Sequence, residues 1–148
     1  MPKRFRTVLV TLPIVVGLFT MPTATAKVGV GPCDVAGRSG ETIAHLIKRR
    51  ITCAAERFGP VPGGATRAIC IAKRESGLDP TATSPTGRYV GLFQHARKYW
   101  PSRYTTWTKP AWQLSTRATN GRSNSIVTLR MVHAAGSWKA AGWPATGC

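Results

Sequence analysis

A single glutamate near the middle of the chain is the strongest candidate for chemistry. Glu75 lies in the segment 68–78, which has the pattern of a short helix, and Gly77 is expected to end that helix. Small and apolar residues recur at helical spacing on the side of the glutamate: Ala68, Ile71 and Ala72. We therefore expect this carboxyl group to be partly desolvated, which favours the protonated form that a general acid needs. The same residues also fit an ordinary glutamate at a helix end.

The overall composition restricts both the mechanism and the partners. The chain has 148 residues, which suits one domain, and it carries 21 basic side chains against 5 acidic ones. The formal net charge of +16 predicts attraction to polyanions, and nucleic acids, anionic membranes and bacterial wall polymers all qualify. Any acid–base mechanism must use one of these acidic residues: Asp34, Glu41, Glu56, Glu75 and Asp79.

Residues 1–26 have the pattern of a secretory signal peptide. A basic start is followed by an apolar stretch at 8–19 and by a small-x-small cleavage site at 24–26. A membrane anchor is the alternative, but the apolar stretch is short for a span and Pro13 interrupts it. We therefore expect a secreted protein, extracellular or associated with the cell wall, with no stable membrane anchor. Cleavage would lower the net charge from +16 to +13 by removing three cations: Lys3, Arg4 and Arg6.

Four cysteines follow the predicted leader, and an even number in a small exported chain indicates two disulfides. The spacing contains no Cys-x-x-Cys clamp and the three histidines are scattered, so we expect no metal site. We expect Cys70 to pair with Cys148, because Cys70 lies about 140° around the helix from Glu75 and a bridge there leaves the acid accessible. Cys33 would then pair with Cys53. The alternative joins Cys53 to Cys70, and Cys33 to Cys148.

After an irregular extension at 27–40, rich in glycine and proline, the rest of the chain is predicted to be one domain, at 41–148. Apolar residues recur at helical spacing over 43–58, opposite a charged face, so an amphipathic helix is expected there. Ser39 is expected to cap this helix, with Glu41 in its first turn.

The second half of the chain alternates turns with short elements. Turn signals at 79–90 leave room for a brief strand at 89–90 paired with 81–83, and a helix is expected to start at 91–95. Asn120 or Ser123 is expected to cap a last helix that ends at Gly136. The predicted class is mainly α with a small β-hairpin. Most members of an aromatic cluster are expected to pack in the core, with one or two on a groove wall: Tyr99, Trp100, Tyr104, Trp107 and Trp112.

An ordered set of short motifs around Glu75 resembles the lytic transglycosylase branch of the lysozyme-like superfamily, in particular its small secreted bacterial and phage-encoded members. The set runs over about twenty residues, and the downstream helix extends the similarity to about residue 136. In chain order the motifs are Glu75-Ser76, the Asp79-Pro80 turn, Ser84-Pro85-Thr86-Gly87 and Gly91-Leu92-Phe93-Gln94.

The resemblance implies a small lysozyme-like α+β domain with a groove beside a hairpin. Glu75 would protonate the glycosidic oxygen between muramic acid and glucosamine in peptidoglycan, and would then take a proton from the carbon-six hydroxyl as an anhydro ring closes. Ser76 would orient Glu75 or the sugar, and these residues would line the groove: Gly91, Phe93 and Gln94. A monomer without cofactor is implied, with peptidoglycan glycan strands and anionic wall polymers as partners.

The chain departs from the family pattern at one place. The family often has Tyr-Asn-Ala-Gly near the end of its third helix, and the matching stretch here is His133-Ala134-Ala135-Gly136. His133 would replace a tyrosine hydroxyl that contacts the acid, or it would be an ordinary core or surface histidine.

Two other function classes are open. A hydrolysing lysozyme would need a second carboxylate across the sugar, roughly 5 to 9.5 Å from the first, and Asp79 is the nearest candidate in sequence. A non-catalytic cationic wall-binding or antimicrobial protein would need only the charge. Nucleic acid is not an expected partner, because the leader predicts export.

Overall fold

The computed structural model describes residues 31–144 and 146–148, so the predicted leader and cleavage site lie outside the described part. Within that part, four α-helices and one antiparallel hairpin form the fold: α1 (Ile43–Phe58), α2 (Gly64–Ser76), β1 (Tyr89–Val90), β2 (His95–Ala96), α3 (Trp100–Trp107) and α4 (Gly121–Ala135). Single-turn 3-10 helices, η1 (Arg97–Tyr99) and η2 (Pro110–Trp112), precede and follow α3. This confirms the predicted class, mainly α with a small β-hairpin.

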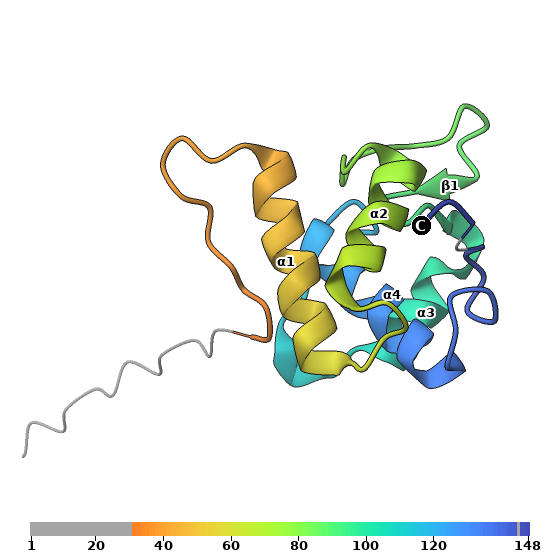
Figure 1. The fold of residues 1–148 in the computed structure, drawn as a ribbon. Helices are drawn as coiled ribbons and strands as arrows, with labels where there is room; N and C mark the ends of the chain where they lie inside the picture. The colour runs from red at the N-terminus through yellow and green to blue at the C-terminus, as the bar shows by residue number, and fades with distance from the viewer. Residues whose placement is uncertain (1–30, 145) are drawn as a thin grey trace, which may run out of the picture.

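The core is built around α4, which is buried on nearly every side over its first nine residues. Both α1 and α3 pack against α4, and α2 runs back along α1 after a short turn (Figure 1). Gly121, the first residue of α4, lies so close to α1 that a Cβ atom there would overlap Ile47. The apolar face predicted on α2 is in this core, since these residues are completely buried: Ala68, Ile71 and Ala72.

The start of α1 differs from the prediction. Thr42, not Ser39, caps the helix, and its hydroxyl accepts a hydrogen bond from the His45 N–H at 3.2 Å. Glu41 therefore lies before the first turn, where its carboxylate accepts from the Arg38 N–H at 3.0 Å and pairs with Arg49 at 2.9 Å. A threonine at this position closes the helix end equally well, because its side-chain oxygen meets the same unpaired N–H groups.

The hairpin also differs from the prediction. Tyr89–Val90 pairs mainly with His95–Ala96, and the predicted 81–83 partner contributes only the Thr83–Val90 bridge. No helix starts at 91–95, because Gly91 and Gln94 have φ angles of 81° and 46° and turn the chain back on itself. A Cβ atom at Gly91 would overlap the Ala118 carbonyl and the Asn124 side chain, so the glycine permits close packing on α4.

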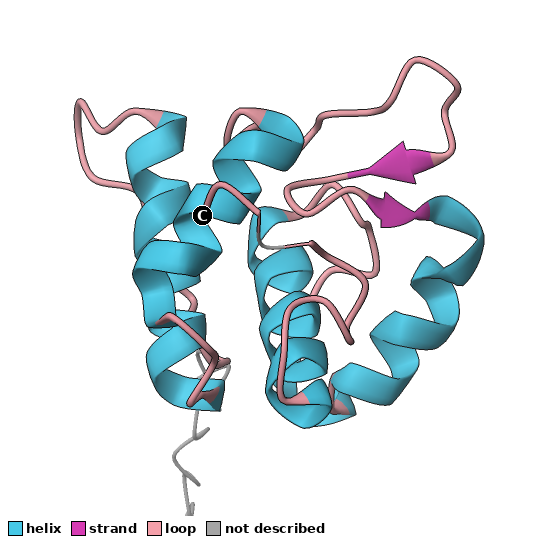
Figure 2. Cartoon of the chain, turned by 45° about the vertical axis from the view of Figure 1, so that its right-hand side comes forward, coloured by secondary structure: helices cyan, strands magenta, loops and turns pink. Residues whose placement is uncertain are grey.

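The segment after α4 folds back over the molecule to α2 and the hairpin (Figures 1 and 2). Two indole N–H groups fix this tail: that of Trp138 donates to the Pro62 carbonyl at 2.8 Å, and that of Trp143 to the Phe93 carbonyl at 2.6 Å. Buried tryptophans need such a partner for the N–H. No helix of the described residues is both long and apolar enough to cross a membrane.

Both predicted disulfides are confirmed. Cys33 is bonded to Cys53, which attaches the segment before α1 to that helix. Cys70 is bonded to Cys148, which attaches the tail to the middle of α2. The alternative Cys53–Cys70 pairing is wrong, although both residues lie on neighbouring helices.

Candidate active-site groove

Glu75 lines an aromatic groove between the end of α2, the hairpin and the tail. One part of this groove has a volume of about 380 Å³ and is lined by Glu75, Tyr89, Gln94, Gly142, Trp143 and Pro144. The adjoining part, of about 230 Å³, shares four of these residues and adds Ala96, Tyr99, Arg103 and Ala141. We call the two parts together the groove. Hollows lined by aromatic side chains with a few polar groups are typical of small-molecule binding sites.

Two larger hollows lack this combination. One, about 720 Å³, lies at the hairpin and is lined by residues 86–89 and 96–98, with three cations and no carboxylate. A second, about 410 Å³, lies on α1 beside Glu56 and contains no aromatic residue. Volume alone would favour the hairpin hollow, but acid–base chemistry needs a carboxyl group, and the groove provides one.

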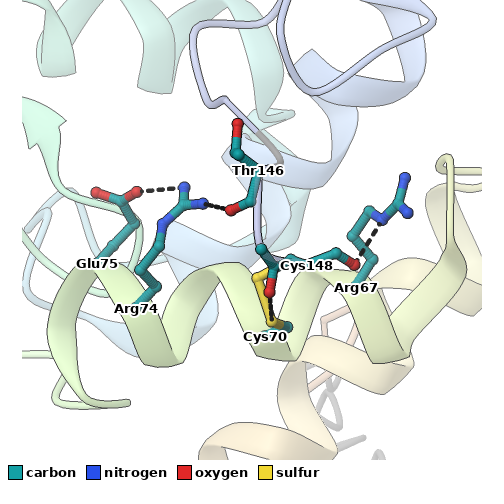
Figure 3. Close-up of a disulfide and its surroundings, with 7 residues drawn as sticks. Arg67, Cys70, Arg74, Glu75, Thr146 and Cys148 are labelled. Atoms are coloured by element: carbon teal, nitrogen blue, oxygen red, sulfur yellow. Dashed lines mark hydrogen bonds and ion pairs between the residues drawn. A yellow bond between two sulfur atoms is a disulfide. The ribbon is translucent and has the colours of Figure 1, made fainter.

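The carboxylate of Glu75 is partly screened from solvent and held by a neighbouring cation. Its side chain is 24% exposed, and Arg74 Nη2 donates to Oε1 at 2.8 Å (Figure 3). This exposure agrees with the partial desolvation expected from the sequence. No other hydrogen bond to this carboxylate is present in the described part of the chain, so Oε2 remains for a ligand. Gly77, in the left-handed conformation, ends α2 two residues after Glu75, as predicted.

Arg74 also connects the acid to the tail. Its Nη1 donates to the Thr146 carbonyl at 2.9 Å, while Arg67, two turns earlier on α2, donates to the Cys148 carbonyl at 3.1 Å (Figure 3). Together with the Cys70–Cys148 bond, these contacts hold the tail along α2. The groove wall formed by the tail is thus positioned by the same helix that carries Glu75.

Of the other predicted site residues, Gln94 is the one that lines the groove with Glu75. Its side-chain nitrogen donates to the Gly91 carbonyl at 2.9 Å and to the Ala82 carbonyl at 3.3 Å. Because both amide hydrogens are used within the hairpin, the amide oxygen is the atom left to accept a hydrogen bond from a ligand.

The structure does not place Gly91, Phe93 or Ser76 on the groove wall. Gly91 is buried against α4, and Phe93 is completely buried, with its ring packed against Trp138 and Trp143. The predicted roles of both residues as wall residues are wrong, because the hairpin turns them inward. The Ser76 hydroxyl donates to a carbonyl of its own helix at 3.0 Å, and Ser76 is not among the residues that line the groove.

His133 also lies away from the acid. Its Nδ1 is 3.0 Å from the Pro60 carbonyl, in the turn before α2. Glu75 is near the other end of α2, and at about 1.5 Å per residue the helix separates the two ends by roughly 16 Å. The proposed replacement of the family tyrosine by His133 is therefore wrong, and His133 is a surface residue.

The buried His95 contacts Arg103, one of the residues that line the groove. The Nε2 of His95 is 2.8 Å from the Thr128 hydroxyl, and that hydroxyl donates to the Asn124 carbonyl. The hydroxyl must therefore accept from Nε2–H, which leaves Nδ1 to accept from Arg103 Nη1 at 3.0 Å. Burial, and secondarily the charge of Arg103, lowers the pKa of His95 from 6.5 to about 3, so the ring is neutral.

This neutral histidine predicts a loss of stability in acid. Between pH 6.5 and about 3 the unfolded chain binds a proton on His95 that the folded chain does not, so stability falls as the pH falls through this window. Each pH unit costs at most about 1.4 kcal/mol. Urea unfolding between pH 7 and pH 5 should show this slope, and a His95→Asn variant should show a flatter one. The exposed His133→Asn variant should keep the original slope; equal slopes in all three proteins would contradict the assignment.

Sequence reasoning missed most of the groove wall, including three of its large side chains: Tyr89, Arg103 and Trp143. Residue 89 was expected only in a strand. Tyr99 belonged to a cluster from which one or two wall residues were expected, and it is one of them. Among the described residues, no group of three potential metal-binding side chains is present.

Comparisons with known proteins add nothing to this geometry. No family model matches the chain, and neither the curated proteins nor the solved structures provide a match.

Proposed function

We propose that this chain is a secreted enzyme that cleaves the bond between muramic acid and glucosamine in peptidoglycan, with a lysozyme-like fold and Glu75 as its catalytic acid and base. One observation carries the proposal: the glutamate selected by the ordered motifs is also the carboxylate that lines the aromatic groove. A chance glutamate at a helix end would not need to meet both conditions.

The groove favours ring closure over hydrolysis. All five acidic residues lie in the described part of the chain, and the other four contact neither hollow of the groove. Asp79, the candidate for a second carboxylate, instead accepts hydrogen bonds from the Thr81 N–H and hydroxyl at 2.8 and 2.7 Å. A two-carboxylate mechanism therefore has no evident second member here, whereas a transglycosylase needs one carboxyl group.

In the proposed mechanism the proton moves twice through Glu75. The protonated carboxyl group gives its proton to the glycosidic oxygen as the bond to the muramic acid carbon one breaks. The resulting carboxylate then takes the proton of the carbon-six hydroxyl, whose oxygen forms the new bond to carbon one. No water is consumed, and Glu75 ends in its starting protonation state.

Mass spectrometry of the products from purified peptidoglycan tests this function. Anhydromuramyl ends would support the transglycosylase, and reducing ends would identify a hydrolysing lysozyme on the same bond. The absence of any cleaved glycan, with wall binding or killing that persists in a Glu75→Gln variant, would favour a non-catalytic cationic protein.

The net positive charge of the chain predicts that salt weakens binding to intact wall more than it affects turnover of an uncharged substrate. Binding to intact wall should weaken as salt rises, because exposed charges are screened over about 8–10 Å at physiological ionic strength. Turnover of a short, uncharged glycan fragment should change much less. Replacing the three cations of the hairpin hollow by glutamine should reduce the salt dependence of wall binding: Arg88, Arg97 and Lys98. Equal salt sensitivity on both substrates would contradict a wall-targeting role for the charge.

A further inference from the structure

Arg103 places a positive charge on the groove wall without a carboxylate partner. It is a half-buried residue of α3 and lines the part of the groove that adjoins Glu75. Although all five acidic side chains belong to the described residues, none of them forms an ion pair with Arg103. A half-buried cation of this kind carries a desolvation cost that an anionic ligand could offset.

The guanidinium group is held in position by neutral side chains. One N–H donates to Nδ1 of His95, and the rings of Tyr99 and Trp143 lie 5.7 and 5.9 Å from its carbon atom. His95 is in turn fixed by Thr128 on α4. These contacts orient the guanidinium and leave its charge uncompensated, while its remaining N–H groups are not buried.

We propose that Arg103 binds a carboxylate carried by the glycan substrate, which makes the groove selective for strands of muramic acid over neutral amino-sugar polymers. This inference rests on the proposed function and specifies its substrate. A planar guanidinium suits a carboxylate because two parallel N–H groups can donate to its two oxygens. Muramic acid differs from glucosamine by a lactyl ether that ends in a carboxyl group, which is a free carboxylate wherever no peptide is attached to it. The strand would pass Arg103 and Glu75 along the same wall.

Binding measurements on a Glu75→Gln variant, which should hold substrate without cleaving it, test the inference. The probes are a glucosamine–muramic acid tetrasaccharide with free lactyl carboxylates, its methyl ester, and a chitin tetrasaccharide. We expect the free acid to bind about 10- to 100-fold more tightly than the ester, as befits a charge-assisted hydrogen bond. Adding Arg103→Gln should remove this difference, and Arg103→Lys should restore part of it.

The matched control is Arg57→Gln, which removes the same charge from an exposed position on α1. Equal weakening by the two arginine variants would show a general charge effect and overturn the inference. Equal affinity for acid and ester overturns it as well, and this comparison needs no change at Arg103, so a poorly folded variant cannot obscure it. An oligomer of glycerol phosphate that binds through Arg103 more tightly than the free acid would assign the residue to wall phosphates instead. Failure to bind any of the three sugars would count against the proposed function itself.

Discussion

Replacing Glu75 with glutamine is expected to lower cleavage of purified peptidoglycan by about two to four orders of magnitude, the usual contribution of a general acid. Glutamine keeps the shape of the side chain and cannot supply the proton. Folding should change little, because the pair with Arg74 lies at the surface, where an ion pair contributes at most about 1 kcal/mol. Release of soluble fragments, measured with urea unfolding of the same samples, checks both expectations.

Two further carboxylates serve as controls for this experiment. Glu56→Gln removes an exposed carboxylate from the hollow on α1 and should leave turnover unchanged. Asp79→Asn tests the hydrolase alternative, since a second catalytic carboxylate would make this variant nearly as inactive as Glu75→Gln. Near-normal turnover by Glu75→Gln would remove the acid from the mechanism.

The position of Glu75 could be predicted from the sequence because it depends on local order. The helical spacing of apolar residues on α2 fixes which side faces the core, and Gly77 fixes where the helix ends. The helices α1, α2 and α4 were predictable for the same reason, whereas α3 was not, since the helix expected in that region was to start at 91–95. At the hairpin, local preference was overridden: Gln94 adopts a positive φ that a glutamine rarely takes, while the Phe93 N–H donates to Asn124 on α4. Asn124 is 31 residues away from Phe93 in the chain, so this contact cannot be predicted from the residues around the hairpin.

The groove wall was beyond sequence reasoning for a related reason. Trp143 and Arg103 reach the groove because α3 and the tail, which both follow the hairpin in the chain, fold back against it. His95 orients Arg103 from the core, yet as one of three scattered histidines it carried no signal of that role. The two disulfide pairings were contacts between distant residues that could be inferred, because four cysteines leave few combinations.

Removing the Cys70–Cys148 disulfide is expected to have the second largest effect, on both stability and activity. The bond closes a loop with a sequence separation of 78, against 20 for Cys33–Cys53. In the chain-entropy model, removing the disulfide that closes the longer loop lowers the free energy of unfolding by about 4 kcal/mol. Removing the disulfide that closes the shorter loop lowers it by about 3 kcal/mol. Urea unfolding of the two double serine variants measures these changes.

Activity should separate the two variants much more clearly than stability does. Without the disulfide, the end of the tail is held on α2 by the carbonyl contacts of Arg67 and Arg74. Trp143 and Pro144 of the same segment line the groove, and Trp143 keeps its hydrogen bond to the Phe93 carbonyl. The groove wall should therefore loosen in the Cys70→Ser, Cys148→Ser protein, raising KM for glycan at a temperature where both variants are folded. The Cys33→Ser, Cys53→Ser protein alters the far side of α1 and should keep its KM. If both variants lose activity in proportion to stability, the tail has no special part in forming the groove.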